Sequence, residues 1–146
     1  MAPRRLTKSA TADPSPVRGR ILVLDGDRDT VVNVSGQLTA LGFDVVLTES
    51  TAAWMARIET ELNRGILSGM LVDLVIPVTR GLAKLQIICD RYPQIPMIVM
   101  SDAKNITGLR KAVDLGAREF LVKPFDAELL RIKCLGVFVA RSHSTA

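Results

Sequence analysis

From residue 20 onward, short apolar runs rich in β-branched residues alternate with longer amphipathic stretches, and this alternation restricts the fold more than any other feature of the sequence. The pattern is typical of βαβ units, in which a helix connects two parallel strands. The first run, Ile-Leu-Val-Leu, is apolar throughout, as expected for a central strand that helices cover on both faces. The predicted strands are 21–24, 43–47, 69–72, 97–100 and 120–122.

The stretches that follow these runs carry apolar residues at helical spacing. The five predicted helices are about 29–41, a segment capped by Ser50 that carries Trp54, Ile58 and Leu62, about 81–92, a segment through Ile106, Leu109 and Val113, and 127 to about 140 after an Asp126 cap. Gly42, Pro93 and Gly116 supply helix ends. Five strands and five helices in strict alternation predict an α/β domain, a doubly wound three-layer αβα sandwich around a parallel sheet.

The length of 146 residues suits one globular domain. No window approaches the roughly 20 consecutive apolar residues of a membrane-spanning helix, and no signal peptide is evident, so we expect a cytoplasmic protein without membrane contact. Cys89 and Cys134 lie far apart with no histidine nearby, which predicts buried, reduced thiols rather than a zinc site or a disulfide framework. The single histidine, His143, lies in a polar C-terminal segment, and this excludes a histidine-based catalytic triad.

Positive charge is concentrated at the N-terminus. Residues 1–20 contain five basic residues and one acidic residue, whereas the rest of the chain has equal numbers of both. We expect a disordered basic leader at 1–19, a folded domain at 20–140 and a polar tail at 141–146. Because the folded part has no excess of positive charge, we expect no nucleic-acid binding by this domain.

Polar residues follow four of the predicted strands. They are Asp25-Gly26-Asp27 after the first strand, Asp73 after the third, Ser101-Asp102 after the fourth and Lys123-Pro124 after the fifth. In a doubly wound sheet the functional crevice lies at the carboxyl ends of the strands, so these side chains should converge. Carboxylates suit Mg²⁺, and a lysine supplies a point charge for phosphate oxygens. The sequence therefore predicts a metal ion beside a phosphoryl group.

Residues 20 to about 138 resemble the receiver domain of two-component response regulators. The resemblance rests on Asp-Leu-Val-Ile-Pro at 73–77 followed by Gly81, on Gly116-Ala117, and on Phe-Leu-Val-Lys-Pro-Phe at 120–125. It implies a flavodoxin-like sheet with strand order 2-1-3-4-5. The roles it implies are a phosphoacceptor at Asp73, phosphoryl contacts from Ser101 and Lys123, a switch aromatic at Phe120 and a cis-proline at Pro124.

The same resemblance implies a biochemical activity. A sensor histidine kinase or a phosphotransfer protein would phosphorylate Asp73, and the phosphoryl group would switch a protein-interaction surface; the domain itself would not be an enzyme. Mg²⁺ would be held by Asp25, Asp73 and the backbone carbonyl of Val75, with Asp27 as a further candidate ligand. A carboxylate can accept a phosphoryl group because the transfer needs mainly positioning and charge neutralisation.

Three positions depart from the family pattern. Gly26 replaces the second of two adjacent acidic residues, which in the family usually coordinates Mg²⁺, and this predicts a weakened metal site. Asp102 stands where the family favours a small residue, and Arg80 stands where an acidic residue is common. These departures leave open a second hypothesis, a pseudo-receiver that binds partners independently of phosphorylation.

A third and more remote hypothesis is an enzyme. Asp25-Gly26-Asp27 after an apolar strand also resembles the nucleophile motif of haloacid-dehalogenase-like phosphohydrolases. Such enzymes need a further acidic pair on a later strand end, commonly in a Gly-Asp-x-x-x-Asp arrangement that this sequence lacks. They usually also carry a cap domain, for which the chain has no length.

The last predicted helix is apolar over more than the single face that covers a sheet. One stripe is formed by Leu129, Ile132 and Leu135, and other faces carry Leu130, Val137 and Phe138. Two explanations stay open: a well-buried helix, or a surface that binds a second copy or another partner. We expect weak or phosphorylation-linked homodimerisation through the face formed by the fourth and fifth helices.

Overall fold

The computed structural model describes residues 18–48, 54–74 and 78–139. Four predictions concern residues outside these ranges: the leader up to residue 17, the Ser50 cap, the Val75 carbonyl and the tail at 141–146. Among the described residues, no helix has both the length and the apolar character needed to cross a membrane.

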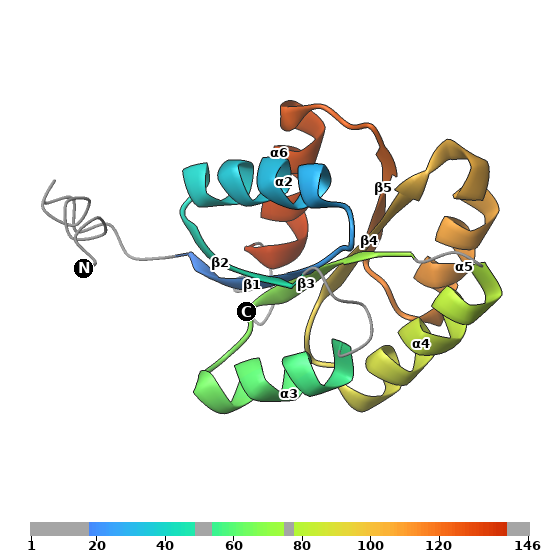
Figure 1. Ribbon diagram of the computed structural model, residues 1–146, viewed down its shortest axis with the longest axis horizontal. Coiled ribbons are helices and arrows are strands. Elements are labelled where there is room, and N and C mark those ends of the chain that lie inside the picture. The colour runs from blue at the N-terminus through green and yellow to red at the C-terminus, as the bar shows by residue number, and fades with distance from the viewer. Residues whose placement is uncertain (1–17, 49–53, 75–77, 140–146) are drawn as a thin grey trace, which may run out of the picture.

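The strands form one parallel sheet in the order β2-β1-β3-β4-β5, as the sequence predicted (Figure 1). The chain crosses back once, because β2 pairs with one side of β1 and β3 pairs with the other. This reversal opens the sheet at the carboxyl ends of β1 and β3. The strands are β1 (Gly19–Leu24), β2 (Phe43–Thr48), β3 (Gly69–Asp73), β4 (Met97–Asp102) and β5 (Glu119–Lys123).

Helices cover both faces of the sheet, with α2 and α6 on one face and α3, α4 and α5 on the other (Figure 1). Each strand is followed by one of these helices, and the helices connect the parallel strands across the two faces of the sheet. The helices are α2 (Arg28–Ala40), α3 (Trp54–Arg64), α4 (Val78–Arg91), α5 (Ile106–Leu115) and α6 (Ala127–Phe138), and a 3₁₀ turn, η1 (Ala103–Asn105), precedes α5.

The sheet separates two apolar cores. Alternate residues of β1 point into different cores: Leu22 packs with α3, α4 and α5, whereas Ile21 and Val23 pack with α2 and α6. All three side chains are fully buried, which explains why this strand is apolar without alternation. The two cores fix the sheet rigidly and so fix the positions of the residues at its carboxyl edge.

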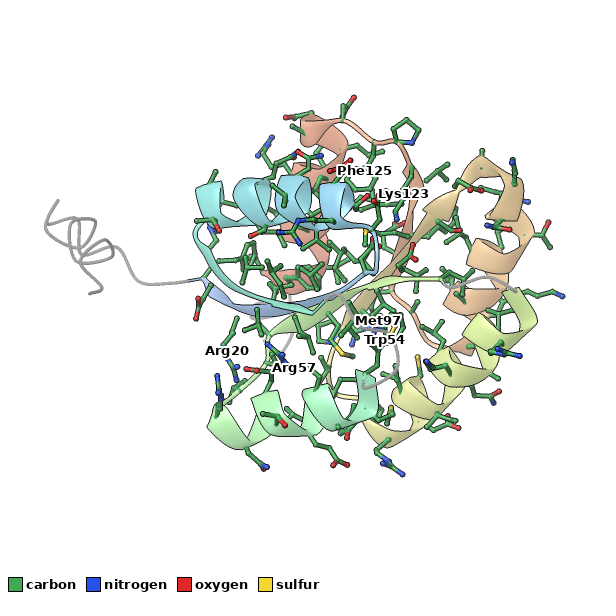
Figure 2. All side chains as sticks on the ribbon, viewed as in Figure 1. Arg20, Trp54, Arg57, Met97, Lys123 and Phe125 are labelled. Carbon is green, nitrogen blue, oxygen red and sulfur yellow. The ribbon has the colours of Figure 1, made fainter. Side chains whose placement is uncertain are left out.

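Glu61 on α3 is a buried carboxylate whose role is structural. Its Oε1 lies 2.6 Å from Arg20 Nη1 on β1, and its Oε2 lies 3.2 Å from Arg57 Nε. Arg20 on β1 and Arg57 on α3 lie close to each other (Figure 2). Because Arg20 also donates to the Glu61 carbonyl, this cluster joins α3 to the first strand and leaves the carboxylate paired.

The structure departs from the predicted elements in several places, since β1 begins at Gly19 rather than at residue 21 and β4 ends at Asp102 rather than at residue 100. Helix α4 begins at Val78, three residues before the predicted start at Gly81. The sequence did not reveal this first turn because it carries no apolar periodicity. The turn η1 was not predicted; it forms because the Asp102 side chain accepts a hydrogen bond from the Lys104 N–H at 3.0 Å. Gly116 ends α5 with φ of 136°, as its predicted role requires.

Candidate functional site

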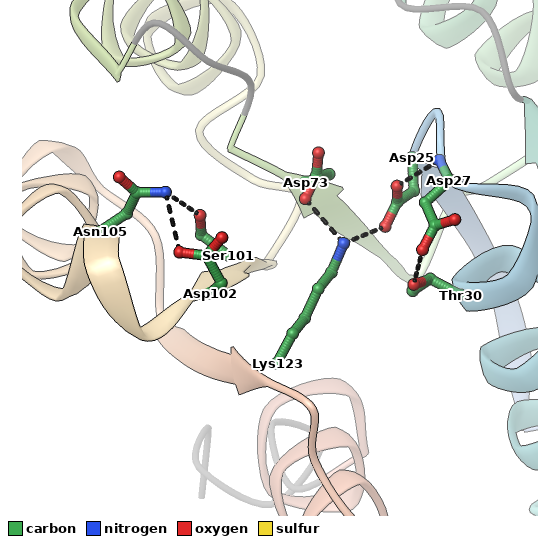
Figure 3. Close-up of polar contacts among 8 residues, drawn as sticks. All are labelled: Asp25, Asp27, Thr30, Asp73, Ser101, Asp102, Asn105 and Lys123. Atoms are coloured by element: carbon green, nitrogen blue, oxygen red, sulfur yellow. Dashed lines mark hydrogen bonds and ion pairs between the residues drawn. The ribbon is translucent and has the colours of Figure 1, made fainter.

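Side chains at the carboxyl ends of β1, β3 and β5 meet at one edge of the sheet (Figure 3). Lys123 Nζ lies 2.9 Å from Asp25 Oδ2 and 2.9 Å from Asp73 Oδ1. Lys123 is the last residue of β5 and Asp73 is the last residue of β3, so the lysine side chain passes over the end of β4 to reach its partners. The convergence predicted from the parallel strand order is confirmed for these three residues.

The two aspartates differ in accessibility. The Asp25 side chain is 1% exposed, whereas that of Asp73 is 23% exposed, so only Asp73 is open to a reactant. Burial raises the pKa of Asp73, and the charge of Asp25 adds to this effect, although the hydrogen bond from Lys123 opposes it. Burial alone would lower the pKa of Lys123, but its hydrogen bonds to Asp25 and Asp73 raise it overall. The lysine therefore stays charged between two carboxylates.

Asp27 lies apart from this arrangement. Its backbone N–H donates to Asp25 Oδ1 at 2.8 Å, and its Oδ2 accepts a hydrogen bond from Thr30 Oγ1 at 2.6 Å. The bond from Thr30 lowers the pKa of Asp27. Its carboxylate is thus directed toward the first turn of α2. In the described ranges, no three aspartate, glutamate, histidine or cysteine side chains form a group that could hold a metal ion.

Receiver domains generally bind Mg²⁺ at an acidic pocket, and the chemistry of the described residues fits such an ion. One oxygen of Asp25 and one of Asp73 face the same point, because both contact a single ammonium nitrogen. These are two hard oxygen donors of the kind that Mg²⁺ binds while it keeps several waters.

Ser101 and Asp102 at the end of β4 share one hydrogen-bond donor (Figure 3). Asn105 Nδ2 lies 2.9 Å from Ser101 Oγ and 3.3 Å from Asp102 Oδ1. Ser101 is buried, and Asp102 is exposed. Asn105 was not predicted from the sequence, although an asparagine four residues after the predicted serine, at the start of the next helix, was a usable signal.

A cavity of about 410 Å³ opens beside the site. Its wall includes Asp27, Thr30 and Asn33 from the start of α2 and Lys123 and Phe125 from β5 and the segment after it. Figure 2 shows Lys123 and Phe125 next to this end of α2. The exposed carboxylate of Asp102 also lines the cavity, so it faces solvent rather than a closed space.

The predicted cis peptide is present between Lys123 and Pro124. The predicted switch aromatic, Phe120, is half-buried on β5, and a lysine that sequence reasoning missed holds it in place. Lys133 Nζ on α6 donates to the Phe120 carbonyl at 2.7 Å, pairs with Glu119 Oε1 at 2.8 Å and lies 5.1 Å from the centre of the Phe120 ring. These contacts cap the outer edge of β5 with side chains.

The sheet order and the lysine-bridged aspartates define the class of flavodoxin-like α/β domains that carry an acidic site at the carboxyl edge of the sheet. Residues 21–134 match the family model of the response regulator receiver domain, and the chain belongs to this family. Proteins of this family act in two-component signalling and are not typical enzymes.

Two regulators and one solved structure illustrate the relationship. The acid tolerance regulatory protein ActR of Sinorhizobium medicae is 30% identical over 126 residues, which are 86% of this chain and 63% of ActR. The transcriptional regulatory protein PrrA of Mycobacterium tuberculosis is 32% identical over 129 residues, 87% of this chain and 52% of PrrA. The chain therefore spans only part of the length of these relatives.

A response regulator receiver domain protein from Clostridium thermocellum has a similar structure, with a TM-score of 0.74 and 25% identity. The match covers 88% of this chain and 99% of that protein. The shared fold extends over nearly the whole of the solved domain.

Proposed function

We propose that Asp73 accepts a phosphoryl group from a phosphohistidine of a sensor histidine kinase or phosphotransfer protein. The observation that carries this proposal is the ion pair between the accessible Asp73 carboxylate and Lys123 at 2.9 Å, beside a second carboxylate, Asp25, that is buried. Asp25 has almost no surface for a reactant, whereas Asp73 lies at the open edge of the sheet. Of the two carboxylates that Lys123 contacts, Asp73 is therefore the acceptor.

In the proposed transfer, an oxygen of the ionised Asp73 carboxylate attacks the phosphorus atom. The new P–O bond forms as the P–N bond to the donor imidazole breaks, and the imidazole nitrogen keeps the electron pair of the broken bond. Lys123 donates to the phosphoryl oxygens, which replace the carboxylate oxygen as its partner. Positioning the reacting groups and neutralising these oxygens are the main contributions that a protein makes to such a transfer.

Mg²⁺, when bound, would supply further positive charge to the phosphoryl oxygens. Asp25 and Asp73 would hold it, with the proposed carbonyl ligand at Val75. Asp27 would join them only by giving up its hydrogen bond from Thr30, which is 2.6 Å long. Because Gly26 contributes no side-chain ligand, we propose that the ion binds more weakly than at a site with two adjacent acids.

The proposed output is a change of surface near β4 and β5. Ser101 would move to the phosphoryl group, and the half-buried Phe120 would follow into the space that the serine leaves. We propose that a second copy of the chain binds to the face of α5 and α6. Leu129 and Ile132 support this assignment, because they are 39% and 54% exposed on α6 although they are large apolar residues.

The test is incubation with acetyl phosphate and Mg²⁺ in solution, followed by intact-mass measurement. We expect the mass of one phosphoryl group on the protein and none on Asp73→Asn. Beryllofluoride, which imitates an aspartyl phosphate, should shift the NMR signals of Ser101 and Lys123 in the wild type alone. An unmodified wild type at every Mg²⁺ concentration would overturn the proposal and favour a phosphorylation-independent binding module.

A further inference from the structure

Asn105 occupies the position before the first residue of α5, but its side chain does not cap the helix. Asparagine is among the best residues for this position because its side-chain oxygen accepts a hydrogen bond from an N–H of the first helical turn. In this structure Asn105 makes no such bond. Its backbone, with φ of −109° and ψ of 27°, also lies outside the extended region that is usual for a capping residue.

The side chain instead forms hydrogen bonds with two residues at the end of β4. Asn105 Nδ2 donates to Ser101 Oγ at 2.9 Å and to Asp102 Oδ1 at 3.3 Å. The orientation of the amide follows from chemistry, because an ionised carboxylate only accepts and must therefore face the NH₂ group. The Asp102 carboxylate has a second donor, the Lys104 N–H at 3.0 Å, so it keeps a partner without Asn105.

Within the described residues, Asn105 is the hydrogen-bond partner of the Ser101 hydroxyl, and Ser101 has no bond to Asp73 or Lys123. If Ser101 moves to a phosphoryl group on Asp73, it must give up the bond to Asn105. The amide group then keeps only its longer bond, to Asp102 Oδ1 at 3.3 Å, and the side chain can turn toward the helix that follows it.

We propose that Asn105 is a positioning residue that exchanges partners on phosphorylation: it holds the Ser101 hydroxyl in the resting protein and caps the N-terminus of α5 in the modified protein. The inference deepens the proposed function and rests on the phosphorylation of Asp73. The exchange is a two-state element, because the conformation that lets Nδ2 donate to Ser101 leaves Oδ1 without a bond to α5. It transmits the occupancy of the site to α5, which belongs to the proposed binding surface.

The first test needs no phosphoryl group. Ser101→Ala removes the better acceptor of Asn105 and leaves Asp73 and Lys123 in place. We expect the amide protons of Thr107 and Gly108, in the first turn of α5, to exchange with solvent about threefold more slowly in this variant than in the wild type. The double variant Ser101→Ala with Asn105→Ala is the matched control and should lose this protection. Equal exchange in the single and double variants would overturn the exchange of partners, whatever acetyl phosphate does.

The second test compares two replacements of Asn105 in the full chain. Both Asn105→Ser and Asn105→Ala lose the bond to Ser101, but only serine can cap α5. Because the serine has no bond to Ser101 to give up, it caps α5 in both states, and beryllofluoride should bind Asn105→Ser within about threefold of the wild type. Asn105→Ala loses a bond in both states and should stay within about threefold of the wild type.

Exchange measurements in the same samples separate this inference from the proposed function. Beryllofluoride should slow the exchange of the Thr107 and Gly108 amides in the wild type alone, because these amides should be protected in both states in Asn105→Ser and in neither state in Asn105→Ala. An equal effect of beryllofluoride on this exchange in all three proteins would overturn the role of Asn105. A wild type that does not respond to beryllofluoride at Asp73 would overturn the proposed function instead.

Discussion

Lys123 Nζ contacts Asp73 Oδ1 at 2.9 Å although the two residues belong to strands that are not neighbours in the sheet. Strand β4 lies between them, and its terminal residues Ser101 and Asp102 are tied to Asn105. The lysine therefore reaches over β4 to the proposed acceptor, whereas the Ser101 hydroxyl is bonded to Asn105 and not to Asp73. This arrangement leaves the serine available to respond to a change at Asp73 while the lysine is already in position.

Replacement of Lys123 by methionine should destabilise the folded protein. The change leaves the carboxylates of Asp25 and Asp73 side by side without a cation, and breaking a fully buried pair in this way costs about 3–5 kcal/mol. The Lys123 side chain is 21% exposed, so solvent screening reduces the expected loss to about 2 kcal/mol. Urea unfolding measures the effect, and Lys111→Met, at an exposed position on α5, is the control. A loss no larger than that of the control would contradict the structural role of Lys123.

Gly26→Asp should restore an acidic pair and strengthen Mg²⁺ binding by about tenfold, because each added carboxylate raises the charge and the number of donors. Gly26→Asn has a similar shape without the charge and serves as the matched control. NMR titration with Mg²⁺ gives both affinities; equal values would show that the missing acid is not what limits the site.

Asp73→Asn should alter stability in a pH-dependent way. Burial raises the pKa of Asp73 above its ordinary value. Because the folded protein holds this proton to higher pH than the unfolded chain, ionisation of Asp73 costs stability as the pH rises, and the cost is complete above the folded-state pKa. The variant should therefore be more stable than the wild type at about pH 7, with no such gain at about pH 3, where both side chains are neutral.

Urea unfolding at a series of pH values measures this difference. Asp44→Asn, at an exposed position on β2 away from the site, reports the effect of losing one carboxylate charge elsewhere. An Asp73→Asn variant that is less stable than the wild type near neutral pH would show that burial does not disfavour the ionised carboxylate.

Ile132→Glu should weaken self-association if a second copy binds to α6. The Ile132 side chain is 54% exposed, so the substitution should leave the fold intact while it places a charge on the proposed contact surface. We expect the dimer that forms with beryllofluoride to dissociate at about tenfold higher protein concentration in the variant. Analytical ultracentrifugation measures this, with Ile87→Glu on α4 as the control. A wild type that stays monomeric at high concentration in both states would rule out the proposed dimer.

The fold was predictable from the sequence because the features that specify its strands and helix ends each lie within a few neighbouring residues. The apolar run at 21–24 is long enough to indicate a strand buried on both faces, and Gly116 and Pro93 mark helix ends through their own backbone preferences. The convergence of Asp25, Asp73 and Lys123 was also predictable. It needs only the rule that parallel strands present their carboxyl ends at one edge.

The partners of individual side chains were not predictable in this way. Asn105 stands where an asparagine usually caps a helix, yet it bonds to Ser101 and Asp102. Lys133 looks like a solvent-exposed lysine of α6 in the sequence, yet it holds the carbonyl and the ring of Phe120. In both cases a flexible side chain chooses among several partners that come from different elements.

By itself, the amino-acid sequence determined the order of strands and helices along the chain and the residue types at the carboxyl edge of the sheet. Both follow from propensity and periodicity, which act over a few neighbouring residues. The tertiary structure alone decided that Asp25 is buried and Asp73 accessible, that Asp27 turns toward Thr30, and that two apolar side chains of α6 remain exposed. Burial and pairing depend on which elements pack together, and that is a property of the whole domain.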